Sequence, residues 1–359
     1  MRKTYIFFLS IPLAVALRVL QADPLVVFGV AAVALIPAAW LMTRATEELA
    51  AKSGPGIGGL LNVTFGNGPE LIFAFIALIE GHHEVVKASL VGSILGNALL
   101  VLGTATAVGG WRRERQTFDR TVAQSYSATL LLAVAVLMLP SLMQLARGDG
   151  LPPVGAGKLD AEFDIHALTI CIAVVLLLSY AGGMFFSLVT HERIFNPRDE
   201  HTVDVNPGKS VWASVGSLAL GAVLVAVTSE IMVDELAHST KTLGISEFFL
   251  GIVVIAIAGN AAEHWVAIVA AHRNQMHLAV TIALGSSAQI ALVVAPLLAL
   301  FSYALPTPLT LVFNPYEIGA LFAAILIAAY ATVEGESTWF KGVQLLALYV
   351  AFVVLFLLA

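Results

Sequence analysis

Two short stretches of this chain repeat the same arrangement of small residues, an amide and a carboxylate. Residues Gly66–Glu70 read GNGPE, and 193 positions later Gly259–Glu263 read GNAAE. Both carboxylates fall inside apolar segments, where an ionised side chain costs about 3 kcal/mol even on lenient insertion scales. Glu70 and Glu263 are therefore the first candidates for a functional site.

Neutral side-chain oxygens accompany each carboxylate. They are Asn67, Ser93 and Asn97 in the first copy, and Asn260, Ser286 and Gln289 in the second. Two carboxylates with several neutral oxygens suit a hard cation such as calcium, which takes six to eight oxygen ligands. The sequence shows no His-Cys cluster with zinc or copper spacing. The structural alternative is that these polar side chains link membrane helices by hydrogen bonds.

The two glutamates are also candidates for binding protons. If they face each other in a low dielectric, they cannot both stay ionised without a large cost. They then hold protons when empty and release them when a cation arrives, and this competition is itself a mechanism of exchange. His264 directly follows Glu263 and is a candidate to tune or relay a proton. The structural alternatives are a protonated glutamate bonded to a neighbouring helix and a histidine that orients one.

Small residues before each glutamate predict a local break in the helix. Pro69 removes a backbone donor and should free the carbonyl of Phe65, which could then bind a cation. The second copy has Ala261-Ala262 instead, so its break should be milder. The alternative is that small residues, Gly92 and Gly285 among them, only permit close helix packing.

A second acidic feature recurs at the ends of two apolar segments. Glu47 and Glu48 close one segment, and Asp234 and Glu235 close another, with Glu230 one turn earlier. These residues could concentrate cations at two entrances or gates, and Glu230 is a candidate for a place inside the ion path. The alternative is that they are solvated helix ends.

The composition identifies the surroundings of these residues. Of 359 residues, 59% are hydrophobic and only 12% charged, whereas a soluble domain carries about a quarter charged residues. The chain is therefore predicted to be an all-α polytopic membrane protein whose partner is the lipid bilayer. The single cysteine excludes a disulfide framework, no basic stripe suggests nucleic acid, and the first segment lacks a cleavage site and is predicted to be a retained span.

Apolar stretches of about 20 residues predict eleven transmembrane helices. Their expected ranges are 4–21, 24–45, 57–79, 85–108, 122–145, 165–189, 211–236, 246–271, 277–302, 313–333 and 340–359.

The distribution of Lys and Arg predicts the orientation. With the N-terminus in the cytoplasm, thirteen basic residues fall inside and five outside, which also places the C-terminus outside. Glu70 and Glu263 then lie five spans apart and cross in opposite directions. We therefore expect an extra helix (1–23), repeat 1 (24–190), a cytoplasmic linker (191–210) and an inverted repeat 2 (211–359), with the site near the midplane.

The repeated motifs extend well beyond the glutamates. The first reads GNGPELIFAFIAL followed by VKASLVGSILGNALLVLG, and the second GNAAEHWVAIVAA followed by ALGSSAQIALVVAP. Along almost the whole chain, this pattern resembles the cation/proton exchanger (CAX) family of the calcium/cation antiporter superfamily. The GNxxE pair with GSSxQ favours this branch over sodium/calcium exchangers, whose repeats typically read more like GTSxPE and GSNxxD.

The resemblance implies eleven spans, a cytoplasmic N-terminus and exchange of cytosolic calcium for protons. The calcium-coordinating glutamates of the family map onto Glu70 and Glu263, and its supporting polar residues onto the six amides and hydroxyls named above. Gly96 stands where many members have serine, which removes one possible ligand. The short form is more like a prokaryotic member, so we expect a plasma membrane location and no autoinhibitory extension.

Two other readings remain open from the residues. One is a sodium- or potassium-coupled exchanger on the same fold. The other is an intramembrane enzyme, which the absence of GxSxG and HExxH patterns disfavours. We expect no enzymatic activity and no cofactor, with Ca²⁺ and H⁺ as substrates. The sequence leaves open the preferred divalent ion and the oligomeric state, a homo-oligomer included.

Overall fold

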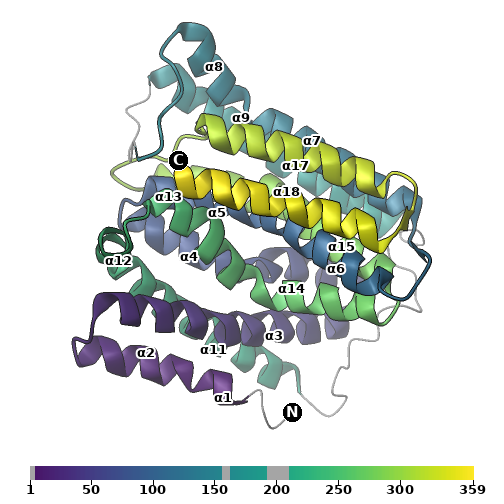
Figure 1. Cartoon of the computed structure of the whole chain (residues 1–359), viewed down its shortest axis with the longest axis horizontal. Helices are drawn as coiled ribbons and strands as arrows, with labels where there is room; N and C mark the ends of the chain where they lie inside the picture. The colour runs from purple at the N-terminus through teal and green to yellow at the C-terminus, as the bar shows by residue number, and fades with distance from the viewer. Residues whose placement is uncertain (1–4, 156–161, 192–209) are drawn as a thin grey trace. The chain divides into compact units, whose positions relative to one another are not determined.

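The chain folds almost entirely into helices (Figure 1). The computed structural model describes residues 5–155, 162–191 and 210–359. In these ranges the only strands are β1 (Gln116–Thr117) and β2 (Glu336–Ser337), which pair antiparallel. The predicted all-α fold is confirmed. The predicted linker lies outside the described residues except at its two ends.

Nine helical segments in the described ranges are long and apolar enough to cross a membrane. They are Pro24–Ser53, His83–Gly110, Arg120–Arg147, Phe163–Thr190, Val211–Asp234, Glu247–His272, Met276–Ser302, Pro315–Thr332 and Trp339–Leu358. Two shorter apolar helices, Ser10–Val19 and Gly68–Ile79, accompany them. The membrane character is confirmed, and the count of eleven spans stays a prediction.

The chain divides into two compact units. The first contains the described residues up to Glu80, those within Tyr180–Glu247, and the short piece Ala258–Ala262. Its helices are α1 (Tyr5–Phe8), α2 (Ser10–Val19), α3 (Pro24–Gly66), α4 (Gly68–Ile79), η2 (Phe186–Thr190), α11 (Val211–Asp234) and α12 (Leu236–Leu243). The last residues of α9 (Phe163–Phe185) also belong to it.

The second unit contains the described residues of Gly81–Ser179 together with Phe248–Ile257 and Glu263–Ala359. Its helices are α5 (His83–Leu95), η1 (Gly96–Val101), α6 (Leu102–Gly110), α7 (Arg120–Leu137), α8 (Leu139–Arg147), most of α9, α13 (Glu247–Phe249), η3 (Leu250–Ile255), α15 (Met276–Gln289), η4 (Ile290–Val294), α16 (Ala295–Ser302), α17 (Pro315–Thr332) and α18 (Trp339–Leu358). Helix α14 (Ala256–His272) contributes residues to both units.

Helix α3 is one run of helical backbone that folds back on itself. A Cβ at Gly58 would lie 2.5 Å from the carbonyl oxygen of Ala50, whereas residues eight apart are separated by about 12 Å along a straight helix. A Cβ at Gly68, in α4, would meet the side chain of Met42. The chain therefore reverses between Ala50 and Gly58, so α3 contains both the predicted second span and the start of the third.

In the first unit, α11 packs along α3 and α4, and α2 packs along α3 (Figure 1). The approach of α11 is close, because a Cβ at Gly221 would lie 2.9 Å from the backbone nitrogen and Cα of Met42. Small residues allow such backbone contact between membrane helices, which associate mainly through van der Waals packing.

The second unit uses glycines in the same way. A Cβ at Gly92, on α5, would overlap the carbonyl of Ile252 on η3, and one at Gly251 would lie 2.9 Å from the Cβ of Ala88. The two segments therefore meet backbone to backbone. The same holds for α6 and α18, where a Cβ at Gly342 would lie 2.5 Å from the carbonyl oxygen of Gly103.

Both copies of the repeat contain a π-helix at the same place. Residues 97–101 of η1 correspond to residues 290–294 of η4 at the offset of 193. The hydroxyl of Ser287 donates to the carbonyl of Ile94 at 3.4 Å, and these two residues are also 193 positions apart. Symmetry-related residues can touch only near a two-fold axis. This contact therefore supports a pseudo-two-fold relation between α5 and α15.

A buried charged cluster lies at the start of α5. Lys87 is buried and donates to the carbonyl oxygen of Val312 at 2.8 Å. Glu317, also buried, forms a capping box with Asn314 at the start of α17. Glu317 therefore has a structural role in the helix N-terminus. Lys87, one of the five basic residues that the predicted orientation assigns to the outside, is part of the core of the second unit.

Candidate functional site

Glu70 lies in the first turn of a helix. Helix α3 ends at Gly66 and α4 begins at Gly68, with Asn67 between them at φ −93° and ψ 25°. The backbone N–H groups of a helix N-terminus lack intrahelical partners, and the helix dipole is positive there. The site therefore favours a carboxylate by about 0.3–1 kcal/mol at low ionic strength.

The predicted helix break before Glu70 is confirmed, but its details differ from the expectation for Pro69. The carbonyl of Phe65, which the proline was expected to free, accepts a hydrogen bond from the N–H of Asn67. A carbonyl oxygen has two lone pairs, so this bond leaves one acceptor position on Phe65.

Within the first unit, the carboxylate of Glu70 lies against the second copy of the motif. A Cβ at Gly259 would be 3.4 Å from Oε1 of Glu70 and 3.6 Å from its Cγ. Asn260 follows directly on α14 and is 1% exposed, and Asn67 is 2% exposed. Glu70 itself is half-buried. The glycine at 259 therefore provides the space in which the Glu70 side chain meets α14.

Glu263 occupies a different setting, in the middle of a helix. Helix α14 continues from Ala256 to His272 without a break, so the milder break that the sequence predicted for the second copy is absent. The hydroxyl of Ser286, on α15, donates to Oε2 of Glu263 at 2.5 Å. Such short hydroxyl-to-carboxylate bonds are roughly twice as strong as neutral ones. Ser286 therefore fixes the orientation of a half-buried carboxylate.

His264 lies beside Gly96. A Cβ at Gly96 would be 3.9 Å from Cε1 of the His264 ring and 4.0 Å from Nε2. The ring is buried, and in the described part of the chain its Nε2 has no hydrogen-bond partner. Buried polar atoms without a partner are rare in folded proteins. The role of His264 as a proton relay stays a prediction.

The remaining predicted ligands lie in the second unit. Ser93 on α5 and Asn97 on η1 are 3% and 0% exposed, and Gln289 at the end of α15 is half-buried. Asn97 and Gln289 thus lie in or beside the two π-helices. π-Turns are frequent at functional sites because they change which side chains face one another. Of the predicted site residues, the structure brings Glu263 into contact with Ser286, and it places Glu70 against Gly259.

The two acidic helix ends differ in their surroundings. Glu48 is buried, accepts a bond from the hydroxyl of Ser214 at 3.2 Å, and lies 3.6 Å from Nε of Arg44. Glu48 is therefore a buried carboxylate with a hydroxyl and a guanidinium as partners, and not a solvated residue at a helix end. Glu47, next to it, is half-buried.

At the end of α11, the acidic residues pair with a helix that lies outside the duplicated segments. Arg18 of α2 forms an ion pair with Asp234, and its Nη1 lies 3.6 Å from Oε1 of Glu230. The side chain of Glu230 is 59% exposed, whereas the sequence suggested a place inside the ion path. Glu235 ends α11 and is half-buried.

Sequence reasoning missed Arg18 and Ser287. Arg18 was counted only among the basic residues on the outside of the membrane, and no local pattern reveals its partner more than 200 residues away. Ser287 stands where the first copy has Ile94, so the repeat did not single it out.

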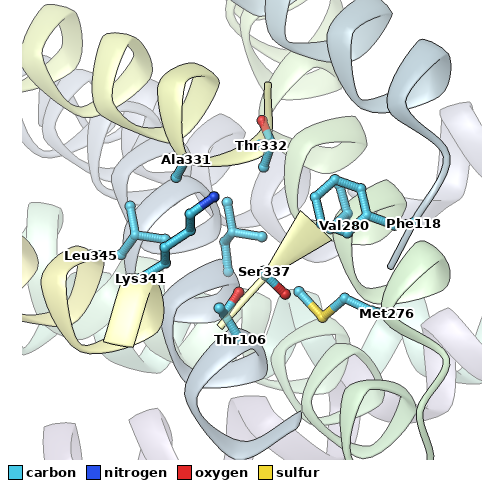
Figure 2. A pocket seen from close by; sticks show the side chains of 10 residues that line it. Thr106, Phe118, Met276, Val280, Ala331, Thr332, Ser337, Lys341 and Leu345 are labelled. Atoms are coloured by element: carbon cyan, nitrogen blue, oxygen red, sulfur yellow. The ribbon is translucent and has the colours of Figure 1, made fainter. Parts of the chain in front are cut away.

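The described residues contain no group of three or more His, Cys, Asp and Glu side chains placed to hold a metal ion. A small cavity in the second unit is lined by side chains that include Thr106, Thr332, Ser337 and Lys341 (Figure 2). None of the predicted ligands is among the residues that line it.

Comparison with known proteins places the chain among ion exchangers. Residues 24–189 and 213–358 match the family described as sodium/calcium exchanger protein. A protein of Aphanothece halophytica named Ca(2+)/H(+) antiporter is 37% identical, over 98% of this chain and 95% of its own. The Ca(2+)/H(+) antiporter ChaA of Bacillus subtilis is 38% identical over 97% of each chain. The crystal structure of the Ca2+/H+ antiporter protein YfkE covers 100% of both chains with a TM-score of 0.83 and 35% identity.

Proposed function

The chain belongs to the sodium/calcium exchanger protein family, and from this premise we propose that it is an antiporter that exchanges Ca²⁺ for H⁺ across a membrane. The resemblance to cation/proton exchangers stated from the motifs is confirmed by the names of the relatives.

Glu70 and Glu263 are the shared cation and proton sites in this proposal. The observation that carries it is the position of α14. At Gly259 this helix contacts the carboxylate of Glu70, and one turn later it presents Glu263, which is bonded to Ser286. Residues four apart share a face of a helix, with Cβ atoms about 5–6 Å apart. The proposal assigns the cation and the protons to both carboxylates on chemical grounds, because each is an ionisable group in an apolar segment.

The neutral oxygens complete the coordination shell. Asn67, Asn260, Ser93, Asn97, Ser286 and Gln289 supply amide and hydroxyl oxygens, of which calcium can use several at about 2.3–2.6 Å. Their burial supports this role, because a buried amide keeps a fixed orientation while the half-buried carboxylates stay accessible to ions.

The exchange cycle follows from competition for the same oxygens. Calcium requires both carboxylates in their ionised form, so its binding displaces their protons. When the site opens to the other side and calcium leaves, two carboxylates close together in a low dielectric take up protons again. Each carboxylate then moves a proton in the direction opposite to calcium, and in this proposal His264 assists at Glu263.

The proposal includes an inverted repeat and an orientation. The matched segments 24–189 and 213–358 nearly coincide with repeats 1 and 2, and the contact of Ser287 with Ile94 supports a two-fold relation between them. Transporters with inverted repeats bind substrate near the midplane, where the repeats meet. We place the N-terminus in the cytoplasm and the protein in the plasma membrane, as the basic residues and the bacterial relative indicate.

Calcium uptake into proteoliposomes tests the proposal. An imposed pH gradient should drive uptake of radioactive calcium, and a protonophore should abolish it. A sodium gradient without a pH gradient should drive none. Uptake that follows the sodium gradient and ignores the pH gradient would contradict proton coupling and favour a sodium-coupled exchanger.

A further inference from the structure

The extra helix α2 supplies a positive charge to the acidic end of α11. Arg18, near the end of α2, pairs with Asp234 and approaches Glu230. Glu230 and Asp234 are four residues apart and therefore share one face of α11. Helix α2 precedes the first segment of the family match, which begins at residue 24. The counter-charge at this entrance therefore comes from outside the duplicated transport machinery.

The ion pair is accessible to ions in solution. The side chains of Arg18 and Asp234 are each 37% exposed, and that of Glu230 is 59% exposed. Ion pairs this exposed are weak and are screened by salt. The guanidinium therefore changes the local potential more than it holds the helices together.

The acidic pair Glu47 and Glu48, in the interior of α3, differs in both respects. Glu48 is buried and bonded to Ser214, and its basic neighbour Arg44 lies on the same helix, four residues earlier. In α3, the residue that compensates the negative charge therefore belongs to the repeat itself. At the end of α11, that residue belongs to a separate helix.

We propose that Arg18 is a tethered counter-cation that lowers the negative potential at the end of α11, so that the extra helix slows the arrival of cations at this entrance. A fixed positive charge at an acidic entrance reduces the local concentration of mobile cations and hence their rate of entry. The consequence for calcium rests on the proposed function, but the change in potential does not.

The local potential is measured with a reporter cysteine. Ala237, exposed and three residues after Asp234, is changed to cysteine in a Cys171→Ala background, and its reaction rates with cationic and anionic methanethiosulfonates are compared. In Arg18→Gln, the ratio of cationic to anionic rates should rise a few-fold at low salt, as expected when one unit charge is removed within a Debye length of the reporter. The rise should shrink at high salt, and Arg18→Lys should keep the ratio of the parent. An unchanged ratio in Arg18→Gln at low salt would overturn the proposal.

Sided calcium flux then tests the consequence. Arg18→Gln should lower the KM for calcium about two- to five-fold from the side that the end of α11 faces, with kcat unchanged, only at low salt. A purely structural role predicts lower flux from both sides at every salt concentration, and that result would overturn the proposal. If the reaction rates shift as expected but the unaltered protein carries no calcium, the proposed function fails while the effect of Arg18 on the potential stands.

Discussion

The two copies of the GNxxE motif hold their carboxylates in different ways. Glu70 lies at the N-terminus of α4, after a break at Asn67. Glu263 lies in the middle of the unbroken helix α14 and accepts the hydroxyl of Ser286. The first carboxylate is favoured by backbone N–H groups and the helix dipole, and the second by a neighbouring side chain.

This difference shows that the two copies preserve the carboxylate itself more closely than the backbone and side-chain contacts that surround it. Pro69 in the first copy corresponds to Ala262 in the second. Proline is tolerated in the first turn of a helix but not in its interior. The two positions are therefore not interchangeable, although the glutamate that follows each has the same proposed role. The predictions below use each copy as the control for the other.

The largest effect should come from removing either carboxylate. We expect Glu70→Gln and Glu263→Gln each to abolish calcium uptake, because each removes a ligand that binds both calcium and a proton. The loss should exceed the roughly 10–100-fold that follows removal of an outer-shell partner. Proteoliposome uptake measures it, with protein amount and folding checked by size-exclusion chromatography. Near-normal uptake in either variant would remove that carboxylate from the site.

Exchanging proline and alanine directly before the two glutamates should change the stability of the protein by very different amounts. Ala262→Pro introduces proline into the interior of α14 and should destabilise the protein by about 3 kcal/mol or more. Pro69→Ala acts in the first turn of α4 and should change stability by less than about 1 kcal/mol. Thermal unfolding in detergent at one heating rate compares them. Similar midpoints for the two variants would contradict the difference between the copies.

The hydroxyl of Ser286 should matter for calcium affinity. Hydrogen bonds to charged groups contribute about 1.5–3 kcal/mol, so Ser286→Ala should weaken calcium binding by about tenfold or more. Ser286→Thr keeps the hydroxyl and is the matched control. Titration calorimetry of the purified protein provides the measurement. Equal affinity in the alanine variant and the parent would mean that the bond to Glu263 does not support the site.

The glycines of the two copies should differ in their tolerance of a methyl group. A Cβ at Gly92 would overlap the carbonyl of Ile252, whereas one at Gly285 would be 3.6 Å from Cε1 of Tyr126, an ordinary contact. Gly92→Ala should therefore cost about 1–3 kcal/mol. Gly285→Ala should be neutral or stabilising by up to about 1 kcal/mol, because alanine favours a helix.

The same thermal unfolding assay compares the two glycine variants. If both alanine variants unfold at the temperature of the parent, α5 and η3 are not in the backbone contact described above. If both lose stability equally, the two copies pack alike, and the asymmetry at these positions is wrong.

The sequence predicted the main features of the fold for physical reasons that act locally. Apolar runs of about 20 residues can only be helices in a membrane, so the all-α fold followed from composition. The break before Glu70 followed from Pro69, since proline removes a backbone donor whatever surrounds it. The milder break predicted before Glu263 was wrong, because Ala261 and Ala262 keep their backbone donors and the helix continues through them.

Contacts between distant segments could not be predicted in this way. The partner of Arg18 on α11 and the burial of Lys87 against Val312 depend on which helices pack together. The paired π-helices each insert one extra residue per turn into an otherwise ordinary apolar helix, and no residue type marks that insertion. The reversal within α3 agrees with the predicted spans 24–45 and 57–79, which require the chain to turn between them. The helical backbone of this turn was not predicted.

The central claim is that one calcium ion and two protons compete for Glu70 and Glu263. Equilibrium calcium binding to the purified protein as a function of pH tests it most directly. If both carboxylates must lose a proton to bind calcium, affinity should fall as pH falls, approaching a hundredfold per pH unit where both are protonated. In Glu70→Gln and Glu263→Gln, the residual binding should show at most a tenfold change per pH unit. Calcium affinity that stays constant between about pH 5 and 8 in the unaltered protein would contradict a shared site.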